Sequence, residues 1–258
     1  MLMKHMKQQY NNQYIDSPNL PTGEVTAVAL SADAKKAIEK LQSLNIETFL
    51  INRDHKLPKP VSSHTDLQIL HIGKNVIFSA TEHLCTGEFN KNFKVTKIGA
   101  ELRNIYPKDV PLNCKIVGKN IFLNRKTIAK EILEFAQINE FNIINVNQGY
   151  TGCSICVISE SAIITDDISI YRAAQNYLND VLVVSKNSIR LKGYDYGFIG
   201  GCCGKLGPNK LAINGRIESH IDHNKILDFV NKHGVDIIEL SNDVLTDIGG
   251  ILPLMQRI

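Results

Sequence analysis

A short sequence recurs within this chain, and the recurrence constrains the fold more than any single residue does. The run I-G-K-N-V-I-F-S at residues 72–79 returns as V-G-K-N-I-F-L-N at residues 117–124. Looser copies follow as E-S-A-I-I-T-D at 160–166 and N-K-L-A-I-N-G at 209–215. Each copy follows another strand-like run and precedes a stretch with helical spacing, so we interpret the chain as a series of repeated supersecondary units.

Helix-then-strand pairs complete the repeated unit. They begin near residues 32, 81, 126, 168 and 222, and the second is the weakest helix because Gly87 interrupts it. The run Glu24–Leu30 supplies a leading strand, while the chain ends on an unpartnered run, G-G-I-L-P-L-M-Q-R-I. We therefore predict an α/β fold of five β-β-α-β modules, a pseudo-fivefold propeller closed by the N- and C-terminal strands. An open doubly wound sheet is the alternative.

Composition supports one sizeable folded unit. With 258 residues, 43% of them apolar and 21% charged, we expect a single domain over residues 23–258, preceded by a polar, flexible tail over residues 1–22.

The net charge of +3 is small and the basic residues are scattered, so nucleic acid is an unlikely partner. No apolar run approaches the roughly 18 residues of a membrane span. Six cysteines without an export signal indicate reduced thiols and a cytoplasmic location.

The predicted ring of five modules resembles the pentein fold. This fold is shared by guanidino-group-modifying enzymes (arginine deiminases, amidinotransferases and dimethylarginine hydrolases) and by a ribosome anti-association factor. The resemblance covers Glu24–Ile258, and H-T-D-L, G-F-I-G-G and D-I-G-G-I-L-P-L resemble an uncharacterised bacterial family of this fold. It implies that a cysteine thiolate attacks a guanidinium or amidine carbon, a histidine protonates the leaving nitrogen, and carboxylates hold the planar cation. No cofactor or metal is required, and the oligomeric state stays open.

The segment His64-Thr65-Asp66 carries two of these roles by resemblance. It opens a run in which Leu67 and Ile69 alternate with polar residues, and side chains two apart on a strand share a face. In arginine deiminases a His-Leu-Asp at the start of a module supplies the acid/base histidine and a cation-binding aspartate. The alternative is a structural pair at a strand end. His71 lies at odd separation from His64 and should face away.

The nucleophile is the point where the family pattern fails. In many relatives the reactive cysteine follows a Gly-Gly in the last module, where this chain has Ile251 and Leu252. Two places could supply the thiol instead, or the chemistry could be absent. One is Cys153, which follows two glycines at the module position equivalent to His64; the other is the adjacent pair Cys202 and Cys203 after a Gly-Gly. A four-thiolate zinc site that adds Cys156 is disfavoured, because strand residues three apart face opposite sides.

Acidic and aromatic residues complete the predicted site. The candidates for holding a cation or walling its pocket are Asp66, Asp195, Asp247, Tyr150, Tyr194 and Tyr196. The motif H-I-D-H at 220–223 reads as a helix cap rather than a catalytic or metal site, and G-G-C-C-G-K-L lacks the spacing of a phosphate loop. We expect a hydrolase or transferase acting on a small guanidine- or amidine-containing molecule. The alternative is a catalytically inactive pentein that binds a ribosome or another macromolecule.

Overall fold

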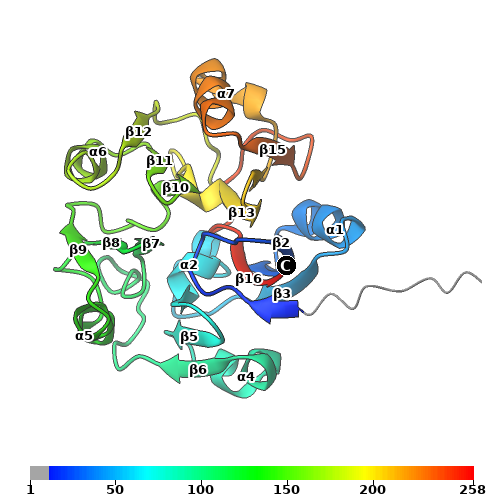
Figure 1. Cartoon of the computed structure of the whole chain (residues 1–258). Helices are drawn as coiled ribbons and strands as arrows, with labels where there is room; N and C mark the ends of the chain where they lie inside the picture. Colours follow the sequence, from blue (N-terminus) through cyan, green and yellow to red (C-terminus); the bar gives the residue numbers. More distant parts are fainter. Residues whose placement is uncertain (1–11) are drawn as a thin grey trace, which may run out of the picture.

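Five separate small sheets make up the structure of residues 12–258, which a computed structural model describes (Figure 1). One sheet has four strands in the order β1 (Asn12–Tyr14), β16 (Leu252–Arg257), β2 (Glu24–Ser31) and β3 (Glu47–Ile51). The other four have three strands each: β4 (Ile69–His71), β5 (Val76–Ser79) and β6 (Lys94–Lys97); β7 (Lys115–Val117), β8 (Asn120–Leu123) and β9 (Asn142–Asn145); β10 (Ile155–Ser159), β11 (Ala162–Thr165) and β12 (Asp180–Val183); β13 (Cys203–Gly207), β14 (Lys210–Ile213) and β15 (Asp236–Glu239). The predicted α/β class is confirmed.

Every three-stranded sheet repeats one topology. Its first two strands are antiparallel, and its second and third strands are parallel. A parallel pair needs a crossover connection, and a helix provides it each time. The crossover helices are α3 (His83–Thr86) with α4 (Glu88–Asn92), α5 (Lys130–Ile138), α6 (Ile168–Ala174) and α7 (His223–Lys232), while α1 (Lys35–Ser43) joins β2 to β3. Gly87 separates α3 from α4, as the sequence predicts.

The C-terminal strand lies in the same sheet as the first long strand. β16 is antiparallel to β2, with Leu252 opposite Ala29, and β2 is parallel to β3. β1 pairs with the other edge of β16, and the backbone N–H of the fully buried Ile15 donates to Leu254 O at 3.0 Å. Part of the expected tail is thus folded from residue 12 onward, while residues 1–11 lie outside the described residues.

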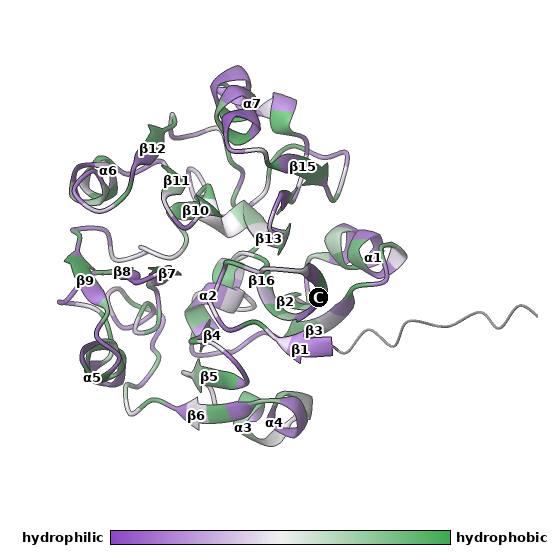
Figure 2. Ribbon diagram, viewed as in Figure 1, coloured by the Kyte–Doolittle hydropathy of each residue, from purple (hydrophilic) through white to green (hydrophobic). Residues whose placement is uncertain are grey.

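Apolar residues are concentrated on the strands and on the inward faces of the helices (Figure 2). In α5, Ile132 and Ala136 are fully buried against the β7–β9 sheet and its neighbour, whereas Lys130 and Glu134 are exposed. Complete burial of a side chain such as Ile132 contributes about 1.5–3 kcal/mol to folding. The helices consequently cover the outer edges of the sheets and leave the first strand of each three-stranded sheet near the centre (Figure 1).

The predicted strand from His64 is wrong at its start. Residues Thr65–Gln68 form a helical turn, α2, and β4 begins only at Ile69. Tertiary hydrogen bonds explain the difference: Asp66 N donates to Gly249 O at 3.1 Å, and the Gln68 amide donates to two backbone carbonyls.

Within residues 12–258, no helix combines the length and apolarity needed to cross a membrane.

Candidate active site

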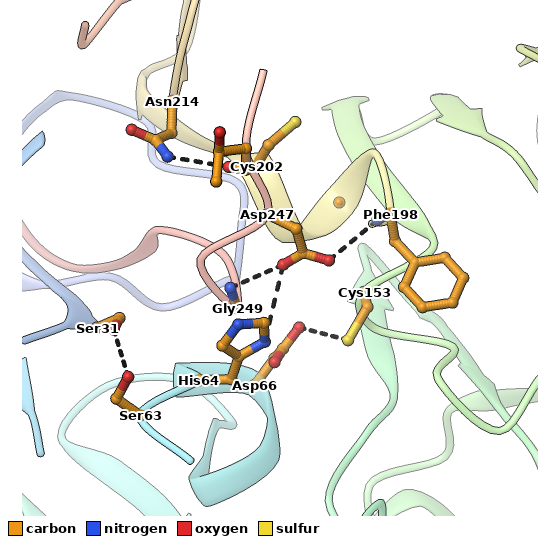
Figure 3. A network of polar contacts seen from close by, with 12 residues as sticks. Ser31, Ser63, His64, Asp66, Cys153, Phe198, Cys202, Asn214, Asp247 and Gly249 are labelled. Atoms are coloured by element: carbon orange, nitrogen blue, oxygen red, sulfur yellow. Dashed lines mark hydrogen bonds and ion pairs between the residues drawn. The ribbon is translucent and has the colours of Figure 1, made fainter. Parts of the chain in front are cut away.

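A small pocket lies where three segments that precede central strands meet. His64 precedes α2 and β4, Cys153 precedes β10, and Asp247 precedes β16. All three line one cavity of about 190 Å³. Figure 3 shows their side chains gathered together with Asp66. The aromatic part of the lining consists of Tyr150, Tyr194, Tyr196 and Phe198.

The Cys153 thiol has two side-chain partners. Its Sγ donates to Asp66 Oδ2 at 2.7 Å and accepts from Asn113 Nδ2 at 3.1 Å, and the residue is 2% exposed. Burial, together with the negative charges of Asp66 and Asp247, raises the pKa of this thiol well above its usual value, against the opposing hydrogen bond from Asn113. Cys153 is therefore a neutral thiol at neutral pH.

Asn113 is a site residue that sequence reasoning missed. Its Oδ1 accepts from the backbone N–H groups of Gly152 at 2.6 Å and Cys153 at 3.3 Å, so one amide fixes both the loop and the thiol. It is almost fully buried. The repeat offered a signal, because Asn113 precedes β7 by the same two positions that separate Cys153 from β10.

His64 and Asp247 form the second polar pair. The distance from His64 Nδ1 to Asp247 Oδ1 is 3.7 Å, a close electrostatic contact that exceeds hydrogen-bond length. The Asp247 carboxylate also accepts from Phe198 N and Gly249 N, each at 2.9 Å. Burial raises the pKa of Asp247, while His64 acts in the opposite direction. The carboxylate is thus fixed by backbone donors beside the imidazole.

Two glycines leave room for this pair. A Cβ added to Gly201 would lie 2.1 Å from Asp247 Oδ1, and one added to Gly249 would lie 2.5 Å from His64 Cβ. Gly249 also has a positive φ of 77°, which side-chain-bearing residues rarely adopt. One glycine of each Gly-Gly run therefore provides a close-packing surface here, Gly201 for Asp247 and Gly249 for His64.

The structure places the other predicted substrate-binding residues at different depths. Tyr150, Asp195 and Tyr196 line the pocket, with Asp195 exposed. The Tyr150 hydroxyl donates to Asp109, and its ring stacks on Phe198 with the centroids 5.8 Å apart. Asp66 lies behind Cys153 and lines a separate internal cavity instead of the pocket.

Cys202 and Cys203 do not reach the pocket. Cys202, labelled in Figure 3, belongs to a 3₁₀ turn (Gly200–Cys202), and its Sγ donates to Ile199 O at 3.2 Å. Cys203 starts β13 and packs with Cys156 in an apolar cluster. The turn directs these thiols into the core, so only Cys153 among the predicted cysteines shares a cavity with His64.

The H-I-D-H segment makes local structural contacts. Asp222 N donates to His220 Nδ1, and the Asp222 carboxylate accepts from Ser185 N and the Lys225 ammonium. These partners hold the start of α7 against the preceding loop. In the described part of the chain, no group of three or more His, Cys, Asp or Glu side chains is placed to hold a metal ion, and the four-thiolate arrangement is not formed.

Several solved structures share this fold. The inosamine-phosphate amidinotransferase of Streptomyces griseus matches with a TM-score of 0.60 and 10% identity over 94% of this chain and 97% of that chain. The dimethylarginine dimethylaminohydrolase (DDAH) of Pseudomonas aeruginosa, solved with citrulline, matches with a TM-score of 0.55 and 10% identity over 91% and 100%. The agmatine deiminase of C. jejuni gives 0.53 and 10% over 94% and 96%. At such low identity these matches establish the fold alone, and the pentein resemblance is confirmed.

The sequence comparisons lead to a family without an assigned activity. No curated protein matches the sequence significantly. Residues 29–252, which are most of the chain, match the family described as "Family of unknown function (DUF6873)". The chain belongs to that family.

Proposed function

We propose that this protein is a cysteine-dependent enzyme that acts on a C–N bond of a small guanidine or amidine. In this proposal Cys153 is the nucleophile, His64 the acid/base, and Asp66 and Asp247 the carboxylates that attract the cation. The observation that carries it is that Cys153, His64 and Asp247 line one small pocket, with Asp66 against the thiol. The five sheets would form a pentein-like propeller, closed where β16 pairs with β2.

Electrostatics couple thiol ionisation to substrate binding. Burial and the carboxylates of Asp66 and Asp247 raise the pKa of the Cys153 thiol, so the unliganded pocket disfavours a thiolate. A guanidinium in the pocket supplies the compensating positive charge and lowers the pKa of the thiol. The nucleophile would therefore form when the cation is bound, which suppresses reactions with neutral electrophiles.

The first half-reaction uses the groups already in contact. The thiol proton passes to Asp66 Oδ2, which accepts its hydrogen bond. The sulfur electron pair attacks the central carbon and forms an S–C bond. The bond from that carbon to the leaving nitrogen breaks, and protonated His64 donates a proton to the departing amine or ammonia.

The second half-reaction restores the site. Neutral His64 takes a proton from a water molecule whose oxygen attacks the same carbon. The S–C bond breaks, and the sulfur recovers its proton from Asp66. In a transferase an amine would take the place of water.

The remainder of the pocket suits a small cation. Tyr150, Tyr196 and Phe198 present ring surfaces, which attract a cation. A cavity of about 190 Å³ limits the substrate to a small molecule. All six cysteines are free thiols, which fits a reducing compartment such as the cytoplasm.

A catalytically inactive binding protein is the second candidate. It is favoured by Ile251, which occupies the place of the relatives' reactive cysteine and is buried in an apolar cluster with Leu206 and Ile248. In that case the pocket would be a remnant, and the protein would act through its surface on a macromolecular partner.

Labelling with a haloacetamidine, a cationic amidine with a leaving halide, separates the two candidates. The proposed enzyme should be labelled at a single cysteine near pH 7, and Cys153→Ser should abolish the labelling. Cys85→Ser is the control, because Cys85 is the only free cysteine that is not fully buried among the described residues. Slow, equal labelling of several thiols would favour the inactive binding protein.

A further inference from the structure

Three aromatic rings form one wall of the pocket. Tyr150, Tyr196 and Phe198, which we call the aromatic wall, all line it. The rings of Tyr150 and Phe198 are nearly parallel, with their centroids 5.8 Å apart and an interplanar angle of 23°. The ring of Tyr196 meets that of Phe198 edge-on, with the centroids 5.7 Å apart. The three rings thus make a continuous aromatic surface.

Contacts outside the pocket fix this surface in place. The Tyr150 hydroxyl donates to Asp109, which is 2% exposed. The ring of Tyr106, which does not line the pocket, packs nearly parallel to that of Tyr150 with the centroids 6.1 Å apart. Gly149 leaves the space for it, since an added Cβ would lie 2.5 Å from the Tyr106 ring. A surface fixed before binding costs little further ordering when a ligand covers it.

The aromatic wall is joined to the groups proposed to react. Phe198 N donates to Asp247 Oδ2 at 2.9 Å (Figure 3). Tyr150 precedes Cys153 by three residues in one turn, in which Ser154 N donates to Tyr150 O at 3.1 Å. A substituent on an amidine that reaches Cys153 is therefore expected to lie against the rings of Tyr150 and Phe198.

The charges of the pocket disfavour a carboxylate on that substituent. Asp195 and Asp247 line the pocket, and the lining that the described residues form contains neither lysine nor arginine. Two like charges at close range repel each other, most strongly where water is excluded. The lining therefore attracts an amidinium and repels an acidic tail.

Three cations line a neighbouring hollow instead. Arg53, Lys59 and Lys192 contribute to this hollow, which has a volume of about 510 Å³ and shares His64 and Asp247 with the pocket. The aromatic wall does not line it. A substrate that placed an acidic tail against these cations would leave the aromatic surface uncovered.

The volume of the pocket sets the size of the substituent. An apolar cavity of about 150 Å³ holds one benzene molecule. The pocket, at about 190 Å³, therefore has room for one benzene-sized ring with an amidine attached.

We propose that the substrate is a guanidine or amidine that carries a flat, uncharged aryl group and no carboxylate, with the ring packed against Tyr150 and Phe198. Aromatic rings prefer offset-stacked or edge-to-face neighbours, and the wall offers both orientations. Tyr150 and Phe198 are accordingly specificity-determining residues. This inference rests on the proposed function, because it names the substrate class of the same site.

Protection of Cys153 against haloacetamidine by matched amidines tests the substrate class. Benzamidine should give half-maximal protection at a concentration about 30-fold lower than acetamidine, because its ring is buried against aromatic neighbours. Cyclohexanecarboxamidine, which has a ring of similar size that is not flat, should protect about fivefold less well than benzamidine. The acid para-amidinobenzoate should protect about tenfold less well than benzamidine, because the pocket repels its carboxylate.

The same experiment separates failure of this inference from failure of the proposed function. Equal protection by benzamidine and acetamidine, with labelling of Cys153 intact, would overturn the substrate class and leave the proposed function standing. Stronger protection by para-amidinobenzoate than by benzamidine would place the substituent in the cationic hollow and would also overturn it. Absence of labelling at Cys153 would contradict the proposed function itself.

Phe198→Leu tests the wall with a side chain that stays apolar and loses the ring. We expect the preference for benzamidine over acetamidine to fall about fivefold, while protection by acetamidine stays within about twofold of wild type. Phe135→Leu is the matched control, because the Phe135 ring contacts Phe78 and Phe141 and lies outside the pocket lining. An unchanged preference in Phe198→Leu, or an equal fall in Phe135→Leu, would show that the wall does not recognise an aryl group.

Discussion

Cys153 and Cys202 occupy similar places in the repeated unit and have opposite surroundings. Each follows a glycine and comes just before the first strand of a three-stranded sheet, β10 for Cys153 and β13 for Cys202. Cys153 contacts side chains from two other modules, Asp66 and Asn113, and lines the pocket. Cys202 bonds to a carbonyl three residues earlier and is enclosed by apolar groups. Side chains from neighbouring modules, rather than local sequence, therefore distinguish the thiol at the pocket from the thiol in the core.

The largest expected effect concerns the charge of the reagent that meets Cys153. A neutral haloacetamide should label it about 100-fold more slowly at pH 7 than the matching haloacetamidine. The reason is that burial, Asp66 and Asp247 raise the pKa of the thiol, and only the cation compensates. The rate with the neutral reagent should then rise about tenfold per pH unit through pH 9. Equal rates for the two reagents, or a plateau below pH 8, would contradict this account.

Gly201→Ala tests the space beside Asp247. The added Cβ would lie 2.1 Å from Asp247 Oδ1, so the carboxylate must move away from His64. We expect amidine labelling to slow about 30-fold, which corresponds to about 2 kcal/mol. Gly207→Ala is the control, since its nearest contact is an ordinary 3.7 Å, and labelling should stay within about twofold of wild type. Similar rates for both variants would remove Asp247 from the site.

Asn113 lies beside Cys153 and Asn214 beside Cys202, so alanine variants of these two asparagines compare the surroundings of the two cysteines. Asn113→Ala removes the donor to the Cys153 sulfur, and we expect labelling to slow about tenfold, because a hydrogen bond to a charged group contributes about 1.5 kcal/mol. Asn214 lies beside Cys202, and its side chain donates to Thr246 O. Asn214→Ala should lower the urea midpoint and leave labelling unchanged. If both alanine variants slow labelling equally, the effect is on stability rather than on the thiol.

The repeat made much of the fold predictable. Strand pairs, crossover helices and the break at Gly87 each follow from local hydrophobic spacing and turn residues. The turn Thr65–Gln68 did not, because alternating Leu67 and Ile69 imitate a strand while the deciding hydrogen bonds come from Gly249 and from loop carbonyls. The folding of residues 12–15 onto β16 was missed for a related reason: a polar segment gives no sign of the partner strand's free edge.

The site was predictable in position more than in detail. Equivalent places in the repeat point to His64 and Cys153, and the structure brings both to one pocket, although their chemical roles remain predictions. The helical turn at Thr65 changes the direction of Asp66, so it faces the thiol and the inner cavity instead of sharing a strand face with His64. Asn113 escaped notice because an amide acquires its role only from its partners in space.

Cys202→Ser is expected to have the smallest effect and completes the comparison. Its hydroxyl can still donate to Ile199 O, but a more polar group then lies among apolar side chains, so we expect a loss of about 1 kcal/mol in the free energy of unfolding. Amidine labelling at Cys153 should stay within about twofold of wild type, because Cys202 lines no part of the pocket. Urea unfolding and mass spectrometry of the labelled peptide measure the two quantities. Loss of labelling in this variant, with the fold intact, would transfer the nucleophile to the G-G-C-C segment and reverse the assignment of the two cysteines.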